Sequence, residues 1–194
     1  MNLVRTFNPN KVAYYEKAGW EAYYDHQWGR AFRLMVGLNR EEFGMPFGRA
    51  FLAALDIVRA SIAFAPKDND VPRARHFIER FYQKARRSVG MKAAPTTLAD
   101  LELDYWIVHR QLALRRIQNQ ADDDIEPMIE SLTRLHAALF DSTPEQMRSS
   151  AEWRALAAKA VDRITGRYSN DVAADWREVE SSLQKAYQAV VAAG

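Results

Sequence analysis

The residues best suited to chemistry lie in the segment 96–116, where an apolar pattern is interrupted by a few polar groups. Glu102, His109 and Arg110 stand among apolar residues that recur every three or four positions, the spacing of one helical face. An enzyme built on them would use His109 as the proton carrier, Arg110 to hold an anion and Glu102 to orient the histidine. A polar group left unpaired in a buried helix would cost about 1–3 kcal/mol. We therefore expect each of the three to have a specific partner.

The turn 66–70, Pro-Lys-Asp-Asn-Asp, offers a second set of polar side chains. Asp68 and Asp70 could hold a cation or a substrate amine, or could join His109 if the turn folds over it. The turn lacks the glycine and the distant glutamate of a calcium loop. Capping of the following helix explains the same residues without a ligand. Both interpretations stay open at this point.

Potential metal ligands are present, but their spacing is poor. Two ligands on one helix must lie three or four residues apart to reach one ion. His76 and Glu79 have that offset, whereas Glu102 and His109 are seven apart, about 10 Å along a helix. Convergence from two helices is the alternative, through Glu102, His109, Glu130 and His136. Structural histidines with hydrogen bonds explain the same residues, so we expect no metal.

Aromatic residues crowd the first predicted helix and recur in the segment 96–116. The candidates for contact with a ligand are Tyr23, Tyr24, Tyr105 and Trp106, together with the cationic Arg80. Large rings at helical spacing can wall a pocket, with tyrosine hydroxyls orienting a ligand. They can also simply form the core, or, if exposed, a surface through which two copies associate.

The helix predicted over 71–89 is strongly basic, with six Lys and Arg side chains and Glu79 as its only acid. Such a face could bind phosphate or RNA. A solvated face of an amphipathic helix explains it equally, and the acidic stretches 100–104 and 122–126 could balance it. The N-terminal region also lacks the small-residue turn of a DNA-binding helix pair. The patterns therefore argue against a nucleic-acid partner.

Composition excludes several classes of protein. The chain has 194 residues, a formal net charge of only +2 and no cysteine, so disulfides, thiol catalysis and Cys-bound metals are ruled out. The phosphate-loop and dinucleotide glycine patterns are missing, and we expect no cofactor. Residues 1–10 contain no apolar export signal. The most apolar segment, 50–65, contains Asp56 and Arg59 and falls short of the ~20 apolar residues of a membrane span. We expect a soluble cytoplasmic protein.

Helical periodicity with Pro, Gly and capping residues between the periodic segments predicts about eight helices and no strands. They are expected over residues 11–27, 26–43, 47–62, 71–89, 98–116, 125–140, 143–165 and 171–190. The expected N-terminal caps of five of them are Asn8, Asp25, Asp70 or Asn69, Thr97 and Thr143. The prediction is an all-α, single-domain irregular bundle over 1–194 around the helix 98–116. The last two helices, 143–194, would pack on it as a hairpin.

Five segments support the same fold by resemblance. FGMPFGRAF, PKDND, FIERFYQ, DYWIVHRQL and LHAALF, in this order, resemble segments of a family of uncharacterised all-helical bacterial proteins. The resemblance covers roughly 14–140. It implies a helical fold and a bacterial origin, and it implies no activity, cofactor or site.

The sequence leads to one main functional hypothesis and two alternatives. The main one is a non-catalytic protein that binds a small molecule or a protein partner, through an aromatic-lined groove or a homodimer surface. The first alternative is an enzyme with acid–base or metal-assisted chemistry around Glu102, His109, Arg110 and the Asp68/Asp70 turn. The second, weaker one is binding of phosphate or RNA through the helix 71–89.

Overall fold

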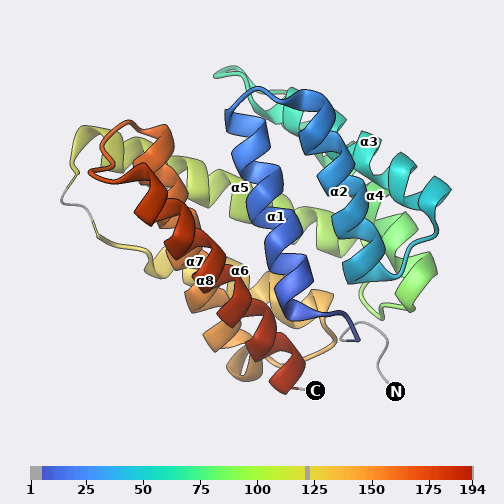
Figure 1. Cartoon of the computed structure of the whole chain (residues 1–194). Coiled ribbons are helices and arrows are strands. Elements are labelled where there is room, and N and C mark those ends of the chain that lie inside the picture. Colours follow the sequence, from blue (N-terminus) through green and yellow to red (C-terminus); the bar gives the residue numbers. More distant parts are fainter. Residues whose placement is uncertain (1–5, 121–122, 194) are drawn as a thin grey trace.

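The chain is an all-α bundle, described here from a computed structural model that covers residues 6–120 and 123–193. Within these residues there are eight helices and no strand, which confirms the predicted fold class (Figure 1). The helices are α1 (Pro9–Tyr24), α2 (Trp28–Phe43), α3 (Phe47–Phe64), α4 (Val71–Val89), α5 (Pro95–Gln118), α6 (Glu126–Leu139), α7 (Pro144–Thr165) and α8 (Val172–Ala192).

Three of the five expected caps are present. The side chain of Asn8 accepts from the backbone N–H of Asn10 and Lys11, and Asp70 accepts from that of Arg73. Thr143 forms a capping box with Gln146. Each of these caps satisfies amide groups that have no partner inside the first helical turn.

Two of the expected caps are wrong. Asp25 ends α1 instead of starting α2, because the chain turns at His26, whose φ of 58° is left-handed, and α2 begins after Gln27. Thr97 lies inside α5, which begins at Pro95. Proline has a φ suited to the first helical position and no N–H to satisfy, so the helix starts at Pro95, three residues earlier than expected.

Helix α5 crosses the molecule behind α1 in Figure 1 and has neighbours on several sides. It packs against α4 and α6 and also touches α7. The main core cluster contains residues of all eight helices, and a second cluster lies between α5, α6 and α7. The hairpin of α7 and α8 packs on the rest of the molecule through α6 and α1.

The burial of α5 changes along its length. Leu98, Leu103, Tyr105 and Leu112 are buried, as a central helix requires. Leu114, which belongs to the apolar pattern of the segment 96–116, is 54% exposed, whereas the neighbouring Arg116 is 2% exposed. Asp100, near the start of α5, is 58% exposed. The expectation of an enclosed central helix is therefore right for one side of α5 along its length and wrong for the opposite side, which meets solvent.

Within the described residues, none of the eight helices combines the length and the apolar composition needed to cross a bilayer. Residues 1–5, half of the segment considered for an export signal, lie outside the described residues, as does Asp122 of the acidic stretch.

Candidate functional site

One face of α5 carries most of the polar chemistry inside the bundle. Glu102, Tyr105, Trp106 and His109 are spaced three, one and three residues apart, which places them on one side of the helix. Tyr105 is buried and the other three are half-buried. We refer to these four residues as the α5 stripe. Each of the polar groups expected to need a partner has one, although not the partner that the sequence suggested.

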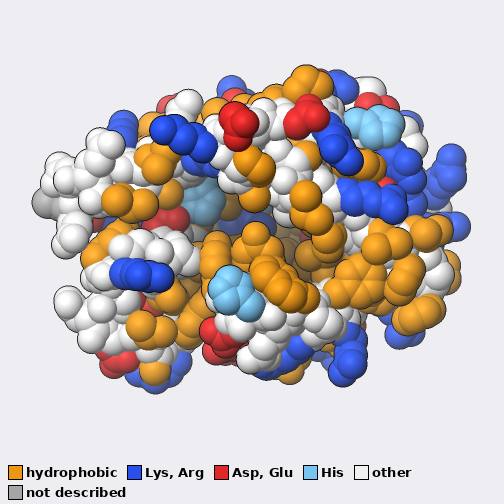
Figure 2. Space-filling view, turned by 90° about the horizontal axis from the view of Figure 1, so that it is seen from above, with side chains coloured by type: hydrophobic (Ala, Val, Ile, Leu, Met, Phe, Trp, Pro, Cys, Tyr) orange, Lys and Arg blue, Asp and Glu red, His pale blue; other side chains and the backbone are white. Residues whose placement is uncertain are grey.

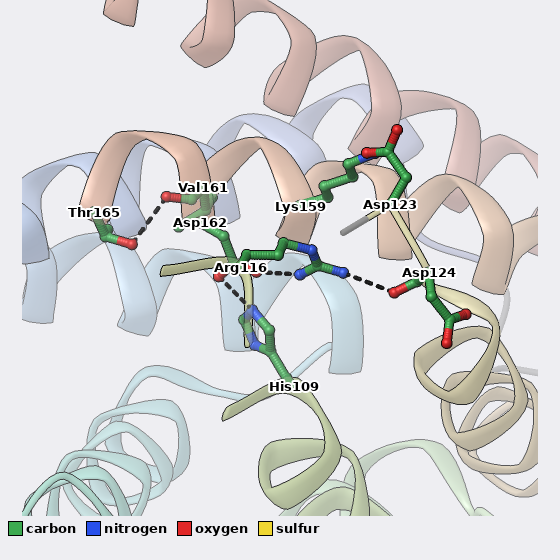
Figure 3. A network of polar contacts seen from close by, with 8 residues as sticks. All are labelled: His109, Arg116, Asp123, Asp124, Lys159, Val161, Asp162 and Thr165. Carbon is green, nitrogen blue, oxygen red and sulfur yellow. Dashed lines mark hydrogen bonds and ion pairs between the residues drawn. The ribbon is translucent and has the colours of Figure 1, made fainter. Parts of the chain in front are cut away.

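At one end of the stripe, His109 pairs with an aspartate of α7. Its Nε2 lies 2.9 Å from Oδ1 of Asp162. The other carboxylate oxygen of Asp162 accepts a hydrogen bond of 2.6 Å from Nη1 of Arg116 on α5. Figure 3 shows Asp162 between the two side chains. Asp162 and Arg116 are 6% and 2% exposed, so this ion pair is part of the interior.

The contact with Asp162 fixes which nitrogen of His109 can act as an acceptor. A carboxylate oxygen only accepts, so Nε2 of a neutral His109 donates and Nδ1 carries the lone pair. No described residue bonds Nδ1. The ring stacks on Tyr105 at 5.7 Å and 10°, which holds its plane. With 26% of its side chain exposed, His109 can present Nδ1 to a ligand.

The α5 turn that contains His109 and Arg110 lies beneath the end of the molecule that carries the α1–α2 and α3–α4 turns. Arg110 donates to the carbonyls of Phe64, Ala65 and Pro66, where α3 ends. Although 41% of Tyr24 is exposed, partial burial, then Tyr23 and Asp162, raise the pKa of this last residue of α1 to about 12. Figure 2 looks onto this end and shows a central hollow surrounded by hydrophobic side chains, with histidine side chains at its rim.

Deeper in the bundle, Arg154 of α7 forms a bidentate ion pair with Glu16 of α1. Its Nη1 donates to Oε2 at 2.8 Å, its Nη2 donates to Oε1, and the hydroxyl of Tyr187 donates to Oε2 at 2.6 Å. Burial alone would lower the pKa of Arg154, but Glu16 holds it well above the ordinary value. Arg154 nevertheless keeps 16% of its side chain exposed to solvent.

Two further glutamates face this pair. Glu102 accepts from the hydroxyl of Tyr82 at 2.9 Å and from Nε1 of Trp106 at 2.7 Å. Glu42 of α2 is 9% exposed, and no described residue gives its carboxyl a hydrogen bond or an ion pair. Burial, together with the charges of Glu16 and Glu102, raises the pKa of Glu42 to about 8. We call Glu16, Glu42, Glu102 and Arg154 the inner cluster.

The residues proposed for an enzyme site do not all meet. Glu102 and His109 share the α5 stripe but have separate partners, and Arg110 holds backbone carbonyls of the α3 terminus, with Phe64 stacked 4.0 Å from its guanidinium. Asp68 and Asp70 line a different, open pocket of about 340 Å³ beside Arg59 and Arg73. Asp70 is used as a helix cap, so the turn does not supply a partner to His109.

The weaker metal candidates lie apart. His136 is buried and shares a hydrogen bond of 3.0 Å with Ser150, and burial lowers its pKa to about 3. Glu130 and His76 are exposed, and Glu79 interacts with Arg75 and Gln83. Among residues 6–120 and 123–193, no group of three or more His, Cys, Asp or Glu is arranged to hold a metal ion.

Most of the basic residues of α4 already have partners. Arg80 and Lys84 pair with the buried Asp56 of α3, and Arg75 pairs with Asp100. Arg86 donates to the carbonyl of Met91. The candidate Arg80 therefore lies at an ion pair between α3 and α4, not beside the α5 stripe. These pairs favour a solvated helix face over a phosphate-binding one.

The aromatic candidates divide between two places. Tyr105 and Trp106 belong to the stripe, and Trp106 packs edge-on against Phe64 at 5.4 Å. Tyr23 and Tyr24 are 42% and 41% exposed and pack edge to face with each other at the α1–α2 turn. The first helix is therefore not simply a core helix. Its terminal rings lie at the hollowed end of the molecule.

Sequence reasoning missed the partners on α7. Met147, Ala151, Ala155 and Ala158 are buried at helical spacing, and Arg154 and Asp162 continue that same face. On α5, Arg116 likewise follows Leu112 by four residues. The signal that could have identified these residues is a charged side chain at the helical spacing of a buried apolar face. It shows that the charged residue needs a buried partner, but it does not identify that partner.

Comparison of the chain with models of known protein families, with curated proteins and with solved structures finds no match. The resemblance to a helical bacterial family thus stays a prediction, and the function has to be inferred from the geometry of the site.

Proposed function

We propose that the protein binds a small molecule in the space between the α5 stripe and the helices α1 and α7. The observation that carries this proposal is the stripe itself. It combines two aromatic rings with a carboxylate and a histidine whose orientations are fixed by partners on other helices. Ligand sites in proteins are mostly apolar and hold a few polar groups in fixed positions. Partial accessibility of His109 and Arg154 supports a space that a ligand can enter.

Trp106 is the residue to change in a test of binding. Trp106→Phe keeps an aromatic ring but removes the N–H that holds Glu102. Trp153→Phe is the matched control, because Trp153 is a half-buried tryptophan of α7 that contacts Lys185 instead of the stripe. Protein purified from its native host would be denatured, and the released small molecules identified by mass spectrometry.

The expected result is a molecule that co-purifies with the wild-type protein and with Trp153→Phe, and that raises the unfolding temperature of both when it is added back. Trp106→Phe should bind it about tenfold more weakly, because one oriented polar contact is lost. If nothing co-purifies, and no compound in a metabolite library raises the unfolding temperature of the wild-type protein, the proposal is wrong.

One observation favours a second candidate function, an acid–base enzyme. His109 has its tautomer set by Asp162, its ring held by Tyr105 and its Nδ1 unoccupied by any described residue. This is the arrangement of a general base. A base of this kind would exchange a proton of the bound molecule with solvent. Deuterium uptake from D₂O into that molecule should then fall by about 10²–10⁴ in His109→Gln. Equal uptake in both proteins would exclude this second function.

A further inference from the structure

We infer that Glu42 and Glu102 bind the ammonium group of a primary amine that has an aromatic or apolar body. The inference rests on the proposed function, because it concerns the ligand of the same stripe. It follows from three properties of the inner cluster, namely its charges, an unpartnered carboxyl group and the low exposure of that group.

The inner cluster has more carboxyl groups than cations. Both terminal nitrogens of Arg154 are used by Glu16, so Glu42 and Glu102 have no cationic partner among the described residues. On α3, the single acid, Asp56, is paired with Lys84. The charged and titratable groups coupled to Glu42 are Glu16 of α1, Tyr82 of α4, Glu102 of α5, Arg154 of α7 and Tyr187 of α8. These surroundings favour a positive charge.

The lack of a partner for the Glu42 carboxyl group points to a ligand independently of the charges of the inner cluster. Its side chain is nine-tenths buried and no described residue bonds it, whereas Glu16 and Glu102 each accept two or more hydrogen bonds. Buried polar groups in folded proteins are almost always hydrogen-bonded, and buried charges are paired. A group that supplies both a hydrogen-bond donor and a positive charge would satisfy Glu42 fully.

The low exposure of these residues and the aromatic rings near them select an ammonium group. Glu42 and Arg154 are only 9% and 16% exposed, so a compact head group suits them. An ammonium is small and brings three donors. Tyr82 and Trp106, which both donate to Glu102, bring aromatic rings close to this carboxyl group, and aromatic rings attract cations and can cover an apolar body. At the other end of the stripe, about 10 Å along α5 from Glu102, Nδ1 of His109 can accept from a hydroxyl.

Binding of an ammonium would displace the proton of Glu42. The neutral carboxyl becomes a carboxylate paired with the ammonium, and its proton passes to solvent. A carboxyl with a pKa of about 8 is roughly nine-tenths protonated at pH 7, so binding should release about 0.9 proton per ligand. An amine held elsewhere on the protein would release none.

Three probes of similar size and shape differ in the charge of one end group, so differences in their affinity report the effect of that charge. Tyramine carries an ammonium, tyrosol a neutral hydroxyl and 4-hydroxyphenylacetate a carboxylate, all on a phenol that can reach His109. Titration calorimetry at pH 7, in phosphate and in Tris buffer, gives both affinity and proton release. Tyramine should bind about tenfold or more tightly than tyrosol, because hydrogen bonds between charged groups are the stronger ones. The carboxylate should bind least.

The variant Glu42→Gln removes the titrating group without changing its shape, and it should abolish proton release and lower the affinity for tyramine about tenfold. Glu41→Gln is the control, because Glu41 is the adjacent glutamate but faces Lys11. It should behave as the wild-type protein does.

Three results would overturn the inference: equal binding of tyramine and tyrosol, tyramine binding without proton release, or no binding of tyramine at 10 mM. The proposed function would survive each of them if the extracted native ligand still depends on Trp106, and would fail only by its own test.

Discussion

Asp162 and Glu42 are two carboxyl groups buried to nearly the same degree, but their surroundings differ completely. Asp162 is 6% exposed and has a partner for each oxygen, His109 on one side and Arg116 on the other. Glu42 is 9% exposed, and no described residue pairs with it. Burial is therefore not what distinguishes a structural carboxylate from one available to a ligand. The difference lies in whether the fold has already supplied the partner.

The same distinction applies to the two ends of the α5 stripe. At the His109 end, buried charges are neutralised within the protein, and one nitrogen of the histidine is left for other contacts. At the Glu102 end, the inner cluster has three carboxyl groups and one arginine, and burial, followed by the charges of Glu16 and Glu102, raises the pKa of Glu42. Four variants can break or sharpen this comparison.

The largest effect is expected from Arg154→Met, which removes the partner that the fold gives to Glu16. Breaking a buried ion pair on one side leaves the other charge uncompensated, and the free energy of unfolding should fall by about 3–5 kcal/mol. Urea denaturation at pH 7 measures the change. The control is Arg148→Met, on the same helix, which breaks the exposed contacts with Glu126 and Glu152 and should cost at most about 1 kcal/mol. Equal losses in both variants would contradict the central role of Arg154.

The second variant, Glu42→Gln, should have the opposite effect and raise the free energy of unfolding. A carboxyl whose pKa is higher in the folded than in the unfolded protein keeps its proton only when folded. Stability then falls as pH rises from about 4.5 to about 8 and levels off above it. The glutamine variant lacks this loss, so at pH 7 it should be more stable than the wild-type protein by on the order of 3 kcal/mol.

Urea denaturation from pH 5 to pH 9 tests this sign directly. The difference between Glu42→Gln and the wild-type protein should grow with pH and then stay constant, whereas Glu41→Gln should follow the wild-type curve. A variant that is less stable than the wild-type protein at pH 8 would show that Glu42 has a partner which compensates its charge.

These expectations depend on contacts that no local pattern specifies. The helices and the face shared by Glu102 and His109 could be predicted, because both follow from spacing within one segment. The partner of His109 lies 53 residues away, and that of Glu16 lies 138 residues away. Such pairs are set by how the helices pack, and a single sequence carries no local signal for that packing. Charged residues in register with apolar faces, such as Arg154, show only that a buried partner is needed.

The third variant, His109→Phe, tests the partnered end of the stripe. Phenylalanine keeps the stacking on Tyr105 but removes the hydrogen bond to Asp162, which retains Arg116. The loss in the free energy of unfolding should be about 1.5–3 kcal/mol at pH 7, the usual value of one hydrogen bond to a charged group. His76→Phe, at an exposed position of α4, is the control for the change of side chain. A loss as large as that of Arg154→Met would mean that Asp162 depends on His109 and not on Arg116.

The smallest effect is expected from Arg75→Gln, which removes the partner of a carboxylate that lies at the surface. Arg75 and Asp100 are 37% and 58% exposed, and the arginine donates a hydrogen bond to each carboxylate oxygen of the aspartate. Water can replace the lost contacts of Asp100, so the variant should lose less than about 1 kcal/mol, and less still in 1 M salt. If urea denaturation instead gave a loss near that of Arg154→Met, the contribution of a paired carboxylate to the free energy of unfolding would not depend on its burial. The contrast between Asp162 and Glu42 would then say nothing about which of them awaits a ligand.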